Sequence, residues 1–200
     1  MLFNTDELSG GQNYRLLTNG VTPRPIAWIS TRSKDGIDNL APYSFFTVVS
    51  CNPPILMYTQ VNQRTGNNKD TLQNLIDTGE CVVNIVSHEL AAQMNQTSAS
   101  LAPQISEFEH ASIKSCPSHS VTPLSVADAP VRYECQYNQS INLGDLPTGG
   151  TMVLLDVKAI YVNDEILAHD NIEQSLIDSV GKMGGNYYSL TKQLIQLQRP

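Results

Sequence analysis

The sequence predicts a mainly β domain, built as an antiparallel barrel with a few short helices inserted. Segments rich in β-branched and aromatic residues recur at hairpin spacing along most of the chain. Polar turns join these segments, and regular helical crossovers are missing, which argues against a doubly wound parallel sheet. The chain has 200 residues, a length typical of one domain, so we expect a single domain over residues 1–200.

The first half of the chain begins with a strand, a turn and a second strand over residues 25–50, where SKDGIDN carries an Asp-Gly hairpin signal. A third strand follows in PPILMYTQV (53–61). The segment TLQNLIDTG (71–79) has apolar residues at helical spacing, with Asp70 or Thr71 as N-cap and Gly79 as the C-terminal stop. CVVNIVS (81–87) then predicts a buried strand.

The second half begins with a predicted helix at HELAAQMNQTSA (88–99). Residues 103–123 are rich in Ser, Pro and His, and we expect loops with one short strand there. Glu107 and Glu109 are predicted to form a solvated face of this region. Two long strands are predicted at 131–143 and 150–164, followed by a helix at 171–180.

Composition excludes several classes of function. Lys and Arg total 12 against 19 Asp and Glu, a formal net charge of -7, which argues against nucleic acid as the main partner. Apolar runs are shorter than the roughly 20 residues that span a bilayer, and the N-terminus lacks a signal-peptide pattern, so we expect a cytoplasmic protein. The cysteines and histidines show no metal-ligand spacing, so free thiols and no metal site are expected.

Dinucleotide-binding and P-loop fingerprints are absent from the sequence, but RTGNNKDTLQN (64–74) places Lys69 and small polar residues directly before a predicted helix. The first turn of a helix presents free N–H groups and a positive dipole end, so Lys69 and Thr71 could hold a phosphate there. Taken alone, the pattern has a simpler interpretation, in which Asp70 caps the helix and Lys69 is solvated.

The segment DNLAPYSFF (38–46) gathers amide, hydroxyl and aromatic groups around a proline. Proline cannot donate a backbone hydrogen bond, so the segment suits a sheet edge, a bulge or a rim that faces a ligand. A planar heteroaromatic ligand would need such a rim, with polar groups for its edge and apolar walls for its faces. A polar hairpin whose aromatic residues are core or interface residues is an equally good interpretation.

Trp28 lies on a predicted strand, where most tryptophans belong to the core, although the neighbouring PRP turn leaves a pocket-lining role open. The sequence has no GxSxG elbow and no Cys-His signature, so nucleophilic hydrolysis is not predicted.

Three segments, in this order and spacing, closely resemble the flavin reductase-like family of FMN-binding split β-barrel proteins, the flavoredoxins among them. The segments are TPRPIAWISTRSKDGIDNLAPYSFFTVVSCNPPILMY (22–58), KDTLQNLIDTGECVVNIV (69–86) and GKMGGNYY (181–188). The similarity covers about residues 14–188. It implies a six-stranded antiparallel Greek-key split β-barrel that forms a homodimer, with FMN near the subunit interface.

The resemblance also implies which residues bind FMN and that none acts as a catalytic acid or base, because the flavin supplies the redox chemistry. The ring edge would lie along the segment from Asn39 to Ser44, the ribityl chain near Ser30 and Thr31, and the phosphate beside the start of the helix. Lys182 stands where the family commonly has an arginine. The full predicted set is Trp28, Ser30, Thr31, Asn39, Leu40, Ala41, Pro42, Tyr43, Ser44, Lys69, Asp70, Thr71, Asn84 and Lys182.

One departure from the family concerns the electron donor. Members that use a nicotinamide donor often carry Gly-Asp-His before the late strand, whereas TGGTMVLLDV (148–157) has Gly149 and Gly150 without a histidine. We therefore carry three hypotheses. The first is an FMN oxidoreductase that reduces flavin or a small acceptor with NAD(P)H. The second is an FMN electron carrier reduced by a partner protein, and the third is a binding module that has lost its flavin.

Overall fold

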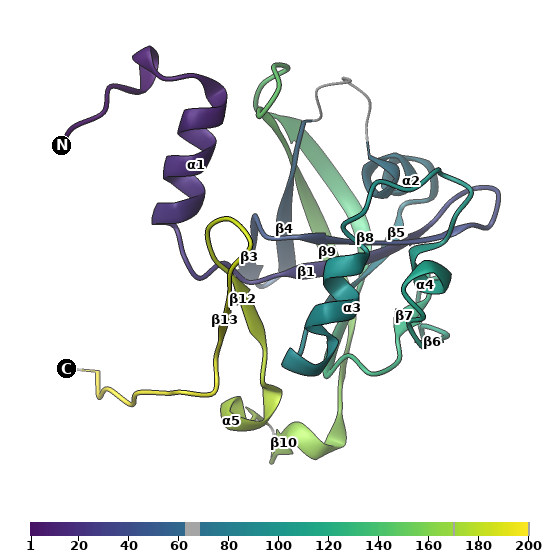
Figure 1. Ribbon diagram of the computed structural model, residues 1–200. Helices are drawn as coiled ribbons and strands as arrows, with labels where there is room; N and C mark the ends of the chain where they lie inside the picture. The colour runs from purple at the N-terminus through teal and green to yellow at the C-terminus, as the bar shows by residue number, and fades with distance from the viewer. Residues whose placement is uncertain (63–68, 170, 200) are drawn as a thin grey trace.

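The computed structural model describes residues 1–62, 69–169 and 171–199 (Figure 1). Its centre is a seven-stranded antiparallel sheet with the strand order β2-β1-β5-β8-β9-β4-β3. The strands are β1 Ala27–Arg32, β2 Asp38–Tyr43, β3 Phe46–Cys51, β4 Pro54–Val61, β5 Glu80–Ile85, β8 Val131–Asn142 and β9 Gly150–Val162. The predicted mainly β split barrel is confirmed.

The predicted number of six strands is wrong, because the segment expected to form one strand over residues 38–50 is two. It breaks at Ser44 and Phe45 into β2 and β3, which then lie at opposite edges of the sheet. The break brings these edges together: the Thr59 N–H of β4 donates to the Phe45 carbonyl at 2.8 Å. The rings of Tyr43 and Tyr58 pack across the same junction, 4.8 Å apart between centroids. The segment 38–46 therefore lies where the barrel closes.

Short helices and two-stranded hairpins lie around the outside of the barrel (Figure 1). None of the helices in the described part of the chain is long and apolar enough to cross a bilayer. The helices are α1 Gly10–Gly20, α2 Asp70–Thr78, α3 Ala91–Gln96, α4 Glu107–His110 and α5 Gln174–Ile177, with 3-10 turns η1 Thr5–Glu7, η2 His88–Leu90 and η3 Asp164–Ile166. The short strands are β6 Ser115–Cys116, β7 Ser125–Val126, β10 Leu167–Ala168, β11 Asn171–Ile172, β12 Val180–Lys182 and β13 Tyr188–Leu190.

Most predicted helices are confirmed, with changed boundaries. Helix α2 ends at Gly79, whose φ of 78° is left-handed, but its N-cap is Lys69 and not Asp70 or Thr71. The helix predicted over 171–180 is much shorter, because β11 takes its start and Asp178 (φ 43°) turns the chain. Helix α4 lies in a region predicted as loop, and α1 was not predicted. A capping box between Ser9 and Gln12 starts α1.

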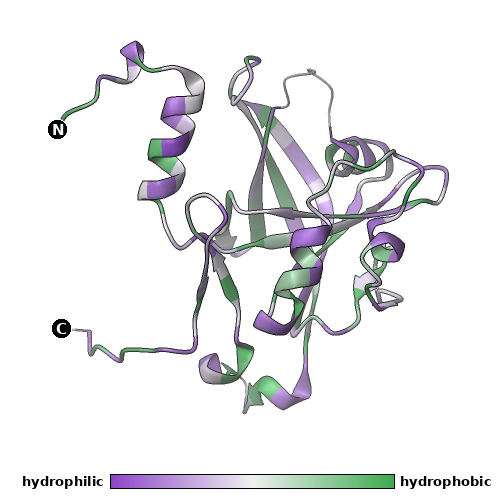
Figure 2. Cartoon of the chain, viewed as in Figure 1, coloured by the Kyte–Doolittle hydropathy of each residue, from purple (hydrophilic) through white to green (hydrophobic). Residues whose placement is uncertain are grey.

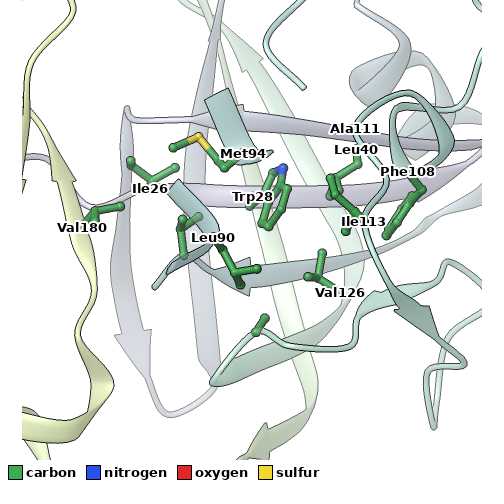
Figure 3. Packing of buried hydrophobic residues seen from close by; sticks show 12 residues of the cluster. Ile26, Trp28, Leu40, Leu90, Met94, Phe108, Ala111, Ile113, Val126 and Val180 are labelled. Carbon is green, nitrogen blue, oxygen red and sulfur yellow. The ribbon is translucent and has the colours of Figure 1, made fainter. Parts of the chain in front are cut away.

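Two hydrophobic clusters lie on opposite sides of β1. One fills the barrel and includes Ile29, Leu72 and Leu75. The other surrounds Trp28 outside the sheet, where α3 and α4 cover it (Figure 3). Strand β1 is therefore buried on both faces, which makes it a rigid support for its neighbour β2.

Arg24 ties three separate parts of the chain together. Its Nη1 donates to the carbonyls of Thr18 and Val21 at the end of α1, and its Nη2 donates to the Met183 carbonyl after β12. Its Nε donates to Ser44 Oγ at 3.4 Å. One buried guanidinium thus holds together α1, the β12–β13 hairpin and Ser44.

Candidate functional site

A buried hydrogen-bond network joins residues 39–44, called the rim from here on, to the start of α2. Asn39 on β2 is its centre: Asn39 Oδ1 accepts from Thr71 Oγ1 at 2.8 Å and from Thr31 Oγ1 at 3.3 Å. Asn74 Nδ2 donates to Thr31 Oγ1 at 3.0 Å, and Asn39 Nδ2 donates to Glu107 Oε2 at 3.0 Å. All five side chains are buried. The structure thus brings together residues that the sequence placed in separate candidate sites.

Local structure explains why these side chains meet. A tight turn after β1 places Asn39 directly opposite Thr31 in the β1–β2 register. Thr71 and Asn74 are three residues apart in α2 and so lie on the same face of that helix. That face packs on β1 and β2. A helix start is therefore held against the first residues of the rim.

Glu107 is the member of this network that the sequence analysis placed wrongly. It was predicted to be solvated, yet its side chain is only 5% exposed. Its Oε2 accepts from the Leu40 N–H at 3.0 Å as well as from Asn39. Burial raises the pKa of the Glu107 carboxyl, while the hydrogen bonds from Leu40 and Asn39 act in the opposite direction. Glu109, in the same helix, is exposed as predicted.

The rim itself lies on an edge strand. Among the described strands, β2 pairs only with β1, and its Leu40 N–H donates to Glu107, so this N–H faces away from β1. The Leu40 side chain is buried, whereas Ala41, Pro42 and Ser44 are partly accessible. An edge strand with a proline and partly accessible residues is the kind of rim that the sequence predicts for a planar polar ligand.

Lys69 supplies positive charge next to this rim. Its Nζ lies 5.5 Å from the centroid of the Tyr43 ring, and burial lowers the pKa of its ammonium group. Lys69 is the N-cap of α2, but its side chain does not cap the helix. The predicted residues 64–68 of this segment lie outside the described part of the chain. A cation beside an uncapped helix start suits an anionic group such as a phosphate.

A cavity of about 210 Å³ opens beside the network. Asp70 lies at its wall, and burial raises the pKa of this carboxyl. The cavity is lined by Ser33, Asp35, Ile37, Asn39, Asp70, Asn74, Pro103, Gln104 and Ile105. Because two carboxylates face it, an anion bound here would depend on Lys69 and on the N–H groups of α2 for its attraction.

Two polar atoms near the barrel closure are buried without a hydrogen-bond partner in the part of the chain that the structure describes. Within the described residues, Tyr58 Oη and Gln60 Oε1 are buried and lack a hydrogen-bond partner. Both belong to β4, which meets β2 where the rim ends. Burial also raises the pKa of Tyr58, so its hydroxyl stays protonated. Buried polar atoms without partners are uncommon in folded proteins, but Tyr58 has no exposed surface and Gln60 almost none, so these atoms do not locate a ligand.

The side chains of Trp28, Ser30 and Asn84 require correction as direct ligand contacts. So does the side chain of Thr31, which has no exposed surface and is bonded to Asn39 and Asn74. Trp28 is fully buried, and its indole N–H donates to Thr97 Oγ1 at 2.9 Å (Figure 3). Asn84 Nδ2 donates to the Trp28 carbonyl at 2.9 Å, and its Oδ1 accepts from the Val126 N–H. Ser30 donates to the Leu124 carbonyl. With no accessible surface and with protein partners, these side chains support the site from beneath.

Lys182 lies on the other side of the rim, in the C-terminal hairpin. Its Nζ donates to the Gly185 and Tyr187 carbonyls and lies 4.4 Å from the centroid of the Tyr188 ring. Burial and the nearby Arg24 lower the pKa of its ammonium group. Lys182 forms backbone hydrogen bonds with Arg24, and the Arg24 side chain donates to Ser44. Lys182 therefore lies near the Ser44 end of the rim, away from α2.

Comparison with known proteins gives consistent relatives. The family model described as "Flavin reductase like domain" matches residues 19–178. An uncharacterised protein of Aquifex aeolicus (strain VF5) is 37% identical over 189 residues, 94% of either chain. The crystal structure of nitrilotriacetate monooxygenase component B from Bacillus cereus matches with a TM-score of 0.93 and 30% identity over 98% of both chains. The 2-nitrobenzoate 2-nitroreductase NbaA of Pseudomonas fluorescens matches with a TM-score of 0.89 and 29% identity, over 100% of this chain and 96% of its own.

Proposed function

The chain belongs to the flavin reductase-like domain family, and we propose that it is an FMN-binding oxidoreductase that reduces flavin or a small acceptor with NAD(P)H. Two similar structures support this class of activity: a monooxygenase component and a nitroreductase, at 30% and 29% identity. The cofactor assignment rests on the residues of the site.

The observation that carries the proposal is the network from Asn39 to Thr71. A flavin mononucleotide needs a polar edge for its ring system and an anion site for its phosphate, at a fixed separation. Asn39 belongs to the rim and accepts a hydrogen bond from Thr71 in the first turn of α2. The rim and the helix start are therefore held together as one rigid unit.

The protein residues would bind and orient the cofactor. Rim residues 39–44 would hold the ring edge, and Lys69, Asp70 and Thr71 would lie at the phosphate. FMN, when bound, would supply the redox chemistry by accepting a hydride and passing electrons on. A hydrogen-bond donor close to the ring edge would stabilise negative charge on the reduced flavin. The Leu40 N–H is not that donor, because it donates to Glu107. The side chains of Trp28, Ser30 and Asn84 would keep β1 and β5 fixed underneath.

A second candidate function is that of an FMN electron carrier that a partner protein reduces. The observation that favours it is the segment before β9, where Gly149 and Gly150 stand without the histidine that often marks use of a nicotinamide donor. Both candidates need the same flavin site, and they differ only in the source of electrons.

The absorbance spectrum of the purified protein tests both candidates. We expect a yellow protein whose flavin band bleaches when NADH or NADPH is added without oxygen. A yellow protein that ignores both nucleotides but bleaches with a reduced protein partner would establish the carrier. A colourless protein that does not bind added FMN would contradict the flavin proposal and would favour a barrel that has lost its cofactor.

The proposal includes a homodimer with FMN near the subunit interface, located in the cytoplasm. Free cysteines suit a reducing compartment. Apolar side chains are exposed on α1, where Figure 2 shows a hydrophobic band, and on the edge strand β3. The exposed set on these two elements includes Leu16, Leu17, Val48 and Val49. Burial of such surface is what favours association.

Light scattering coupled to size-exclusion chromatography tests the dimer. We expect a mass near twice the 22.0 kDa of one chain. Replacing Val48, which is 58% exposed on β3, by aspartate should shift the mass toward the monomer if β3 lies in the interface, because a charge would then be buried. A wild-type mass near that of one chain at micromolar concentration would contradict the proposal.

A further inference from the structure

We propose that Glu107 is a positioning residue that fixes the rim for FMN from outside the barrel. The inference rests on the proposed function and extends it to a residue outside the three segments that carry the family resemblance. Glu107 comes from the short helix α4, more than sixty residues after the rim in the sequence, and reaches the open edge of β2. No other carboxylate among the described residues accepts a hydrogen bond from the rim backbone.

The first step of the argument is the geometry at a single oxygen atom. Glu107 Oε2 accepts from Asn39 Nδ2 and from the Leu40 N–H, both at 3.0 Å. One donor is a side chain and the other is the main chain, and they belong to consecutive residues. The carboxylate therefore fixes both the rotamer of Asn39 and the orientation of the next peptide.

The second step follows from the chemistry of the Asn39 amide. Because a carboxylate can only accept, the group that faces it must be the NH₂ end of the amide. The carbonyl end then faces Thr71 and Thr31, whose hydroxyls donate to it. Glu107 thus determines how β2 is connected to α2, although no hydrogen bond joins its side chain to α2 among the described residues.

The third step is the electrostatic setting of Glu107. The described residues contain no ion pair to this carboxylate, and the acidic Asp70 of α2 lies close enough to disfavour its charge further. A buried carboxylate without a cation costs free energy, which its hydrogen bonds have to offset. An apolar residue at this position would leave the Leu40 N–H and Asn39 Nδ2 without an acceptor, so the carboxylate is explained by the two donors that it holds.

The position of the network relative to the cavity completes the argument. Asn39, Asp70 and Asn74 line the cavity of about 210 Å³ beside the rim. Glu107 lies behind Asn39, and it is not among the residues that line this cavity. It is placed to orient a ligand-facing group without touching the ligand, which is the arrangement expected of a supporting residue.

Four variants of the full-length protein test the inference: Glu107→Ala, Glu107→Gln, Glu107→Asp and Glu109→Ala. FMN dissociation constants are measured by flavin fluorescence, and visible circular dichroism is recorded on each FMN-saturated variant. We expect Glu107→Ala to weaken FMN binding by about tenfold or more, because two hydrogen bonds that fix the rim are lost. The dichroism of the bound flavin should change as well, which loss of overall stability alone would not cause.

The other variants separate position from charge. Glutamine can place its carbonyl oxygen at the Oε2 position, so Glu107→Gln should bind FMN within about threefold of wild type. Glu107→Asp keeps the charge but is one methylene shorter, so it should bind several times more weakly; it replaces the alanine variant if that one does not fold. Glu109 is exposed in the same helix, and Glu109→Ala should behave as wild type.

Three results would overturn the inference. The first is wild-type affinity and dichroism in folded Glu107→Ala or Glu107→Asp. The second is equal weakening in Glu107→Gln and Glu107→Ala, which would show that the oxygen position does not matter. The third is a wild-type protein that does not bind FMN, which overturns the proposed function as well. Binding by the wild type together with unaffected Glu107 variants would overturn this inference alone.

Discussion

Replacing Trp28 with alanine is expected to lower the free energy of unfolding by about 3–5 kcal/mol. Trp28 has no exposed surface and packs in the cluster that α3 and α4 form against β1 (Figure 3). Its loss leaves a large cavity and removes the partner of Thr97, which accepts from the indole N–H. Urea unfolding followed by far-ultraviolet circular dichroism measures the difference, since the intrinsic tryptophan signal is absent from the variant.

Trp28→Phe is the matched control, because phenylalanine keeps most of the apolar volume and loses the hydrogen bond. A smaller cost, about 1–2 kcal/mol, is expected for it. The experiment also decides between the two roles that the sequence leaves open for Trp28. A Trp28→Ala protein with nearly unchanged stability and strongly weakened FMN binding would show that Trp28 is a cofactor contact and that the structural assignment is wrong.

The double change Lys69→Ala, Thr71→Ala is expected to weaken FMN binding by about a hundredfold. Lys69 supplies the cation at the start of α2, and hydrogen bonds to charged groups contribute about 1.5–3 kcal/mol each. Thr71 links that helix start to Asn39. The measurement is a fluorescence titration of the apoprotein with FMN, at fixed and stated ionic strength, because the lost attraction depends on salt.

Lys34→Ala is the control for the loss of charge. Lys34 forms an exposed ion pair with Asp77, near the other end of α2, at 3.2 Å, and such pairs contribute little to stability. It should bind FMN as the wild type does. Unchanged affinity in the double variant would show that the phosphate lies elsewhere. Riboflavin, which lacks the phosphate, should lose much less affinity than FMN if the assignment is right.

The order and type of most barrel strands could be predicted, because their β-branched residues and turns give a strong local signal. The break at Ser44 and Phe45 could not, since both halves of 38–50 have strand-like composition and the bend is required only by closure of the barrel. Helix α1 was missed because three glycines and several polar residues weaken its periodicity. Its only local signal was Ser9 followed by Gln12, a capping box that the structure confirms.

The candidate site also contains residues that the sequence could identify and residues that it could not. Asn39 and Thr71 belong to motifs with a local chemical meaning, and the structure joins them. Glu107 could not be found this way, because it lies among Ser, Pro and His residues where an acidic side chain usually faces water. Trp28 and Asn84 entered the predicted site through the family resemblance, and the local sequence does not reveal that the sheet is covered on both faces at β1 and β5.

The contacts of Arg24 indicate which positions around it can be substituted without loss of the fold. Three of its hydrogen bonds go to main-chain carbonyls, so the guanidinium recognises the course of the chain and not the side chains at Val21 or Met183. Neutral substitutions can accumulate at such positions without any change in the contact. Arg24 itself cannot be replaced in this way, since lysine offers a single ammonium in place of a planar guanidinium that reaches four partners at once. The sequences of α1 and of the C-terminal hairpin can therefore change while both elements stay bound to Arg24 beside Ser44.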